Sequence, residues 1–268
     1  MASILVFMAG TQLYVLTEYT DRFFSWTINP PLTAAFLGAS YWASFLLEFL
    51  ASRKRTWAES RIAVAPVLTF TTLTLIVTLL HLDKFHLDTS AHEPITIFAT
   101  WAWIIVYAVV PPLMFAVLLF QTRLPGADVP RGEPLPIWMR GLLGFHGTVM
   151  VLLGLAFFVA PTAVAPIWPW TLTALTGRAV GAWLLGLGIA ALQVVWENDW
   201  ARVQIALVSY LGLGVLHLIA MMRYLGLFNW SQARSWLYLI FILSIFAVGL
   251  YGTLRARQVV PTALPEAS

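Results

Sequence analysis

The densest group of side chains able to do chemistry is the segment HLDKFHLDTSAHE, residues 81–93. It holds three imidazoles and three carboxylates, namely His81, Asp83, His86, Asp88, His92 and Glu93. Such groups are usual ligands of divalent cations, so the segment is a candidate metal site. However, its histidine spacings of five and six residues match neither HExxH nor a compact zinc pattern. The alternative is a hydrated loop that binds no metal.

A second set of polar side chains lies inside apolar segments, where an ionisable group costs about 2.5 to 3.5 kcal/mol on insertion scales. Counting from the segment ends places Glu48, His146 and Gln193 at similar depth, roughly 5 to 9 Å inside one edge. We expect them to share one polar layer that could bind a ligand. The alternative is structural: Glu48 extends to Arg53 or Arg55, and His146 bonds a neighbouring carbonyl group.

His217 stands alone in its apolar segment, about one and a half turns from the opposite edge. It is either a ligand-binding residue or a structural hydrogen-bond donor. A haem held by His146 and His217 is not expected, because the two lie roughly 13 Å apart along the membrane normal. The sequence leaves any cofactor unknown.

The elements that carry these residues are predicted membrane spans. Of the 268 residues, 60% are hydrophobic and 10% are charged, against roughly 25% charged in a soluble domain. Apolar runs long enough to cross a hydrocarbon core of about 30 Å as helices recur along the chain. We count eight, near residues 3–18, 32–51, 62–82, 96–120, 141–160, 178–196, 202–222 and 236–254. The first is the shortest; a cleaved signal peptide is its alternative, but a basic n-region and a small-x-small site are missing.

Composition also excludes several classes of site. The chain has no cysteine, so disulfides, thiolate nucleophiles and thiolate metal sites are absent. The net charge of +3 comes from residues that flank the spans. The basic segment SRKR, residues 52–55, is therefore interpreted as a topology signal at the lipid headgroups, and no nucleic-acid partner is predicted.

Orientation follows from the basic residues, which are retained on the cytoplasmic side of short loops. With eight spans both termini share a side, and that side holds ten of them: Arg53, Lys54, Arg55, Arg61, Arg123, Arg131, Arg140, Arg202, Arg255 and Arg257. The other side holds five: Arg22, Lys84, Arg178, Arg223 and Arg234. The sequence predicts a multi-pass protein of the cell membrane with both termini in the cytoplasm.

The chain also resembles itself. A shift of 143 positions places WAESRIAV, residues 57–64, over WARVQIAL, residues 200–207. Across 57–85 the identical residues are Trp57, Ala58, Ile62, Ala63, Leu68, Leu73, Leu75, Ile76, Leu82 and Phe85. With four spans in each unit, the sequence predicts two parallel four-helix repeats related by a pseudo-twofold axis along the membrane normal. The predicted units are 1–121 and 140–256, joined by a cytoplasmic linker, 122–139, and followed by a cytoplasmic tail, 257–268; the alternative is chance similarity of apolar helices.

The second unit carries a family resemblance. RGLLGFHGTVMVLLGLAFFVAP, residues 140–161, and GRAVGAWLLGLGIAAL, residues 177–192, each begin with or near a basic residue and are rich in glycine. They resemble the opening pair of helices in DoxX-like four-helix membrane proteins. The resemblance implies a compact four-helix membrane unit. It implies no catalytic residues.

Three classes of function remain open. The first is a non-enzymatic protein that binds an apolar ligand, such as a small molecule, lipid or pigment, or a partner membrane subunit between its repeats. We expect a cavity of a few hundred Å³ there, bordered by Trp42 or Trp183, with Glu48 or His146 as its polar end. The second, a transporter or channel, needs more polar groups along a path. The third, a membrane enzyme, needs a convergent catalytic set that the sequence does not supply.

Overall fold

The computed structural model describes residues 2–124, 128 and 130–260, and this part of the chain is helical without a strand. The long helices are α1 (Ala2–Val15), α3 (Pro31–Ala51), α5 (Val64–Leu80), α6 (Pro94–Arg123), α7 (Ile137–Val159), α9 (Ala174–Glu197), α10 (Trp200–Arg223) and α11 (Ala233–Val259). The short ones are α2 (Thr20–Phe23), α4 (Trp57–Ser60), η1 (Arg61–Ala63), η2 (Leu82–Lys84), α8 (Pro161–Val164), η3 (Ala165–Ile167) and η4 (Leu225–Leu227). The predicted tail beyond residue 260 and four linker residues, 125–127 and 129, lie outside the described residues.

Seven of the described helices are apolar and long enough to cross a membrane, counting α4, η1 and α5 as one helix over Trp57–Leu80. The all-α class is thereby confirmed for the described residues, and the seven apolar helices agree with a multi-pass membrane protein. The first predicted span is the exception, because α1 has 14 residues. At 1.5 Å per residue it extends about 21 Å, which is less than the hydrocarbon core.

Local sequence explains where several helices begin and end. Pro31 and Pro94 occupy first-turn positions of α3 and α6, where a missing N–H costs nothing. Between α9 and α10 the chain reverses in two residues. Asn198 takes the left-handed conformation with φ 46°, and the Asp199 side chain accepts a hydrogen bond from the Arg202 backbone N–H.

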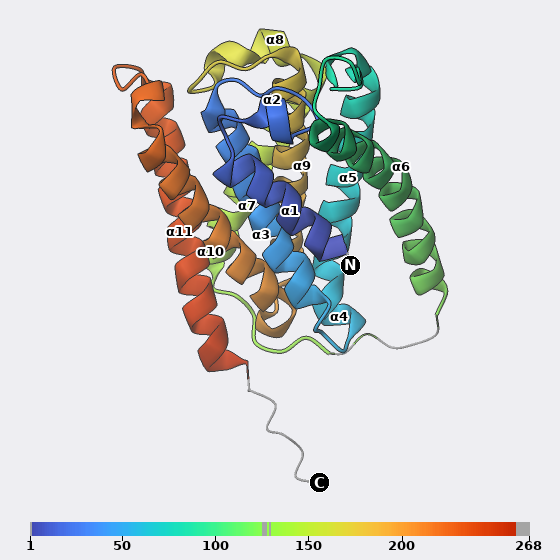
Figure 1. Cartoon of the computed structure of the whole chain (residues 1–268). Helices are drawn as coiled ribbons and strands as arrows, with labels where there is room; N and C mark the ends of the chain where they lie inside the picture. The colour runs from blue at the N-terminus through green and yellow to red at the C-terminus, as the bar shows by residue number, and fades with distance from the viewer. Residues whose placement is uncertain (1, 125–127, 129, 261–268) are drawn as a thin grey trace.

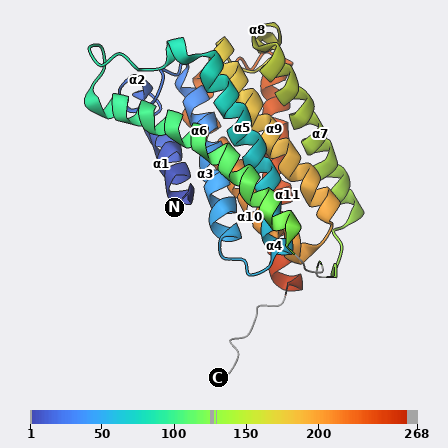
Figure 2. The same ribbon diagram turned by 90° about the vertical axis from the view of Figure 1, so that its right-hand side faces the viewer.

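Four helices form the middle of the molecule (Figures 1 and 2). They are α3 and α5 from the first predicted repeat and α9 and α10 from the second. Two of the helix pairs cross between the predicted repeats: α3 packs on α10, and α5 packs on α9. The other helices lie outside: α1 packs on α3, α6 on α5, α7 on α9 and α11 on α10. The surface where the two predicted halves meet is called the seam below.

Glycines bring α7 and α9 into backbone contact. A Cβ added at Gly154 would lie 2.9 Å from the Gly181 carbonyl oxygen, and one added at Gly188 would lie 2.9 Å from that of Gly147. Each helix thus contributes two glycines seven residues apart to the contact. Such close approach strengthens the van der Waals packing between helices. This packing matters in a membrane, because lipid provides no hydrophobic driving force for helix association.

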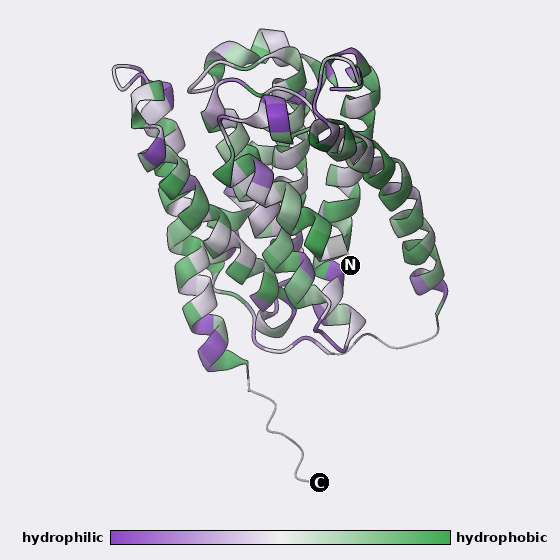
Figure 3. Ribbon diagram, in the orientation of Figure 1, coloured by the Kyte–Doolittle hydropathy of each residue, from purple (hydrophilic) through white to green (hydrophobic). Residues whose placement is uncertain are grey.

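The two ends of the bundle differ in charge. α2 and α8 lie at one end and α4 at the other, in the orientation of Figure 1. The basic residues predicted on one side, including Arg61, Arg140 and Arg202, belong to segments at the α4 end. Figure 3 shows apolar residues running along the helices, with many hydrophilic ones near the helix ends and in the connections.

Candidate functional site

A cavity of about 40 Å³, the seam cavity, lies where the four middle helices meet. Its walls are mainly apolar, and its lining comprises Ser44, Leu47, Pro66, Val67, Phe70, Trp183, Gly186, Leu187, Ala190, Ala206, Ser209, Tyr210 and Leu213. The cavity is bordered by Trp183 and by helices from both predicted halves, and Trp42 is not among its lining residues. Its volume is smaller than the few hundred Å³ expected, because leucine, phenylalanine and tryptophan side chains from all four helices fill the seam.

Two of the predicted polar residues lie directly behind this wall. The Ser44 hydroxyl donates to Glu48 Oε1 at 2.9 Å. The Tyr210 hydroxyl is 2.8 Å from His146 Nδ1, and His146 Nε2 is 2.6 Å from the Ser244 hydroxyl. Glu48 and His146 therefore reach the cavity only through Ser44 and Tyr210, which sequence reasoning did not single out.

Three other predicted residues lie away from the seam cavity. Trp42 packs between α3 and α1, with its ring 4.9 Å from that of Tyr14 and its Nε1 donating to the Phe7 carbonyl at 3.3 Å. Gln193 donates to the Arg61 carbonyl at 3.2 Å. His217 is buried, and its Nδ1 is 2.9 Å from the Leu213 carbonyl oxygen.

The expected polar layer is accordingly not formed. Glu48, His146 and Gln193 each bond to a different partner, and none of the hydrogen bonds among the described residues joins two of them. A similar predicted depth along the helices does not bring side chains together when they point to different neighbours.

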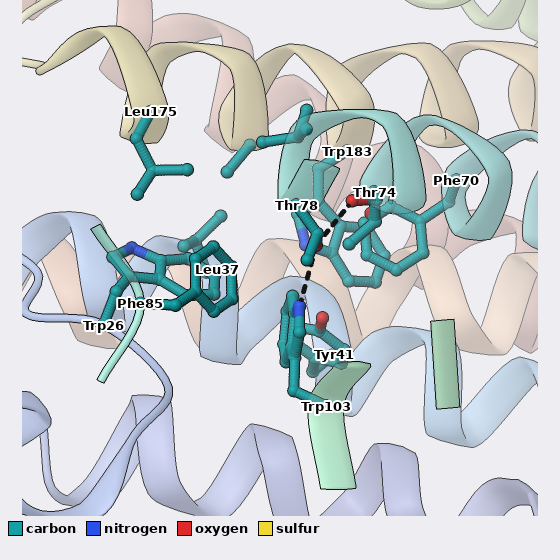
Figure 4. Close-up of a pocket in the computed structure, with 12 residues that line it drawn as sticks. Trp26, Leu37, Tyr41, Phe70, Thr74, Thr78, Phe85, Trp103, Leu175 and Trp183 are labelled. Atoms are coloured by element: carbon teal, nitrogen blue, oxygen red, sulfur yellow. Dashed lines mark hydrogen bonds between the residues drawn. The ribbon is translucent and has the colours of Figure 1, made fainter. Parts of the chain in front are cut away.

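A second cavity, the aromatic cavity, lies nearer the α8 end and is about 10 Å³ in volume (Figure 4). It is lined by Trp26, Leu37, Tyr41, Phe70, Thr74, Val77, Thr78, Phe85, Trp103, Leu175, Ala179 and Trp183. Trp103 Nε1 donates to the Thr78 hydroxyl at 3.0 Å. Trp26 is 3% exposed, yet its indole N–H has no hydrogen-bond partner within the described chain.

Phe70 and Trp183 belong to both cavities. Their rings stack with centroids 3.7 Å apart and an interplanar angle of 26°. Phe70 comes from α5 and Trp183 from α9, so the stack joins the two predicted halves at the boundary between the cavities. An apolar span gives no sequence signal for Phe70, and nothing in the pattern would have identified it.

Ion pairs connect the same two helices at the α4 end. Arg61 bonds Glu197 at two points, Nε to Oε1 at 2.6 Å and Nη2 to Oε2 at 2.8 Å. Glu197 is fully buried and also accepts from Arg202 at 3.1 Å. Asp128 of the linker accepts from both arginines. Four charges from α9, α10, the start of the α4–α5 helix and the linker thus meet in one network.

At the α8 end, α5 and α9 are joined by one hydrogen bond. Arg178 Nη1 lies 2.9 Å from His81 Nε2, and Arg178 Nε donates to the Phe158 carbonyl at 3.2 Å. Burial and the Arg178 charge lower the pKa of His81. His81 is therefore the neutral acceptor of this hydrogen bond.

The six candidate metal ligands are not brought together. His81 bonds Arg178, and His86 lies between the Phe24 carbonyl at 2.9 Å and the Thr27 hydroxyl at 3.0 Å. Burial lowers the pKa of His86, opposing the effect of that carbonyl. The imidazole rings of His86 and His92 lie 4.2 Å apart.

The carboxylates of this segment also have local partners. Asp83 pairs with Lys84 at 2.9 Å, Asp88 accepts from Ser90, and Glu93 pairs with Arg22 at 2.9 Å. Over the described residues, no group of three or more histidine, aspartate or glutamate side chains could hold a metal ion. The geometry therefore gives no support to a metal site here.

Neither family models, nor curated proteins, nor solved structures give a significant match to this chain.

Proposed function

We propose that this chain is a membrane-embedded binding protein that holds a small, mostly apolar ligand between two repeated halves. The observation that carries the proposal is the seam cavity, built by two helices from each half and lined mainly by apolar side chains. Binding sites commonly lie between the helices of bundles and carry a few polar groups that fix orientation. Ser44, Ser209 and Tyr210 are those groups here.

Helix boundaries support the duplication that this proposal uses. The α4–α5 helix spans 57–80 and α10 spans 200–223, so both ends differ by 143 positions. The short helices η2 and η4, Leu82–Lys84 and Leu225–Leu227, differ by the same shift. Chance similarity of apolar composition does not require helix ends to coincide in this way.

Aromatic contacts at the α8 end repeat as well. Trp26 lies 5.1 Å from Phe85, and Trp170 lies 5.7 Å from Phe228, measured between ring centroids. A parallel duplication accounts for both pairs and suits the proposed likeness of the second half to DoxX-like proteins. The crossed packing of α3 on α10 and α5 on α9 makes the two halves one bundle with a shared interior.

The size and chemistry of the seam cavity define the ligand class. A water molecule needs about 10–15 Å³ of such volume, so 40 Å³ holds about three. None of the lining side chains is charged. The ligand is therefore an uncharged molecule of a few heavy atoms, or the end of a longer apolar molecule, with one hydrogen-bonding group near Ser44 or Tyr210.

Purification in a mild detergent, followed by mass spectrometry of the bound small molecules, tests the proposal. Ala206→Leu adds three carbons to the wall of the seam cavity and should abolish binding. Ala108→Leu makes the same change on an exposed face of α6 and should leave it intact. If both variants retain the same molecules as the parent protein, or if the parent protein carries none, the proposed site is wrong.

A further inference from the structure

The two cavities together suggest more than binding. We propose that the seam is a closed pathway by which small uncharged solutes cross the membrane, with the stacked Phe70 and Trp183 side chains as its gate. This goes beyond ligand binding, because binding needs the seam cavity alone. The pathway needs both cavities and the removable barrier between them.

The cavities are arranged in sequence along α3, α5 and α9, the three helices that line both of them. The seam cavity is lined by Pro66 and Val67 of α5, and the aromatic cavity by Thr74 and Thr78, two to three turns further along the same helix. On α9 the corresponding lining runs from Ala190 back through Trp183 to Leu175. Phe70 and Trp183 are the residues common to the two linings, and their stacked rings lie at the boundary between the cavities.

The chemistry of both cavities selects neutral solutes. The seam cavity presents the hydroxyls of Ser44, Ser209 and Tyr210, and the aromatic cavity those of Thr74 and Thr78. Neither lining contains a charged side chain, and an unpaired charge in such a site is strongly disfavoured. A neutral solute with hydrogen-bonding groups replaces its lost water contacts there.

The unpartnered indole N–H of Trp26 specifies one of those groups. Figure 4 shows this nitrogen on the side of the ring that faces Leu175, another lining residue of the aromatic cavity. A buried donor without an acceptor carries a desolvation penalty. A solute with a carbonyl or hydroxyl oxygen in the aromatic cavity removes that penalty.

Each end of the pathway is closed by a polar contact between α5 and α9. Arg61 and Glu197 close the α4 end, and His81 and Arg178 close the α8 end. Both closures are made by side chains from the same helix pair. Separation of the pair at one end opens the neighbouring cavity while the other closure and the Phe70–Trp183 stack remain in place.

Urea is a suitable probe because it is small, uncharged and carries a carbonyl acceptor. The full chain is reconstituted in liposomes, and urea entry is followed by stopped-flow light scattering. Entry should be faster than in protein-free liposomes, and Trp183→Ala should raise it about two- to tenfold by removing one ring of the stack. Trp101→Ala, on α6 and 51% exposed, should leave the rate unchanged. Guanidinium is the charged analogue of urea. Its entry into liposomes that contain the parent protein or either variant should be no faster than its entry into protein-free liposomes.

A second variant does not depend on removing a large side chain. The chain has no cysteine, so Thr74→Cys introduces a single thiol into the aromatic cavity. Methyl methanethiosulfonate should block urea entry through this variant, and dithiothreitol should restore it. Molecules bound in the seam cavity should remain after the block, which separates this proposal from the preceding one. Urea entry equal to that of protein-free liposomes, or entry unaffected by the reagent, overturns the pathway.

Discussion

Arg61 and Glu197 form a two-point ion pair, with N–O distances of 2.6 and 2.8 Å, that joins the first predicted half of the chain to the second. The Glu197 side chain is fully buried, and that of Arg61 is 15% exposed. Arg202 and Asp128 complete the network. The contact therefore fixes α9 against the beginning of the α4–α5 helix at the α4 end.

Glu197→Ala should lower the free energy of unfolding by about 3–5 kcal/mol, because it removes the fully buried carboxylate that Arg61 and Arg202 share. Thermal unfolding in detergent measures the change. Arg22→Ala breaks the Arg22–Glu93 pair, whose side chains are more than half exposed, and should cost about 0–1 kcal/mol. Equal losses in the two variants would contradict a structural role for the buried pair.

Acid should destabilise the α8 end. Arginine stays protonated, so His81 must be neutral to accept the Arg178 hydrogen bond, and its folded pKa is lowered accordingly. As the pH falls, His81 is protonated near pH 6.5 in the unfolded chain, whereas in the folded chain it is protonated only at lower pH. Stability is therefore fully present above about pH 6.5 and decreases as the pH falls below that value.

His81→Gln keeps an acceptor and removes the titration, so its melting temperature should fall less between pH 8 and pH 5.5 than that of the parent protein. Part of the pH dependence that remains in this variant should come from His86, because burial lowers the pKa of His86 as well. Identical pH profiles for the variant and the parent would show that the Arg178–His81 contact does not control acid stability.

Gly154→Ala should destabilise the protein by about 1–3 kcal/mol through overpacking. Its added Cβ would lie 2.8 Å from the Leu185 backbone nitrogen and 2.9 Å from the Gly181 carbonyl oxygen, and backbone atoms cannot move aside as a flexible side chain can. Gly144→Ala, on the same helix, meets nothing within 4 Å and should stabilise by about 0.5–1 kcal/mol. Thermal unfolding of the two variants should therefore show shifts of opposite sign.

Single cysteines test the proposed orientation on a background without thiols. Ser52→Cys at the α4 end and Ser90→Cys at the α8 end both replace exposed residues. With the α4 end in the cytoplasm, a membrane-impermeant maleimide should label residue 90 on intact cells and residue 52 only after the cells are permeabilised. Labelling in the reverse order would invert the topology.

Hydropathy predicted which segments form long apolar helices but not the direction in which each side chain points. The seven spans follow from apolar length alone, whereas α1 ends after 14 residues. Trp42 and Trp183 were both expected at the seam. Trp183 lies there, but α1 covers the face of α3 that carries Trp42. Which helix covers which face depends on tertiary packing.

The partners of the polar side chains were likewise not predictable from the sequence. His81, Asp83 and Glu93 were grouped because they are near one another in sequence, yet each pairs with a different cation. Tyr210, which links His146 to the seam cavity, gave no signal because one tyrosine in an apolar span is unremarkable. Contacts between side chains that are far apart in the sequence can be identified only when the helices that carry them are placed in three dimensions.

The packing of α3 on α10 and of α5 on α9 determines the order in which these contacts can form during synthesis. Arg61 is made 136 residues before Glu197, its buried partner. At a synthesis rate of about 5–20 residues per second, Glu197 is added to the chain on the order of ten seconds after Arg61. During that interval the first half lacks α9 and α10, the helices on which α5 and α3 pack. The faces of α3 and α5 that form the seam are therefore covered by the second half only after α9 and α10 have been translated.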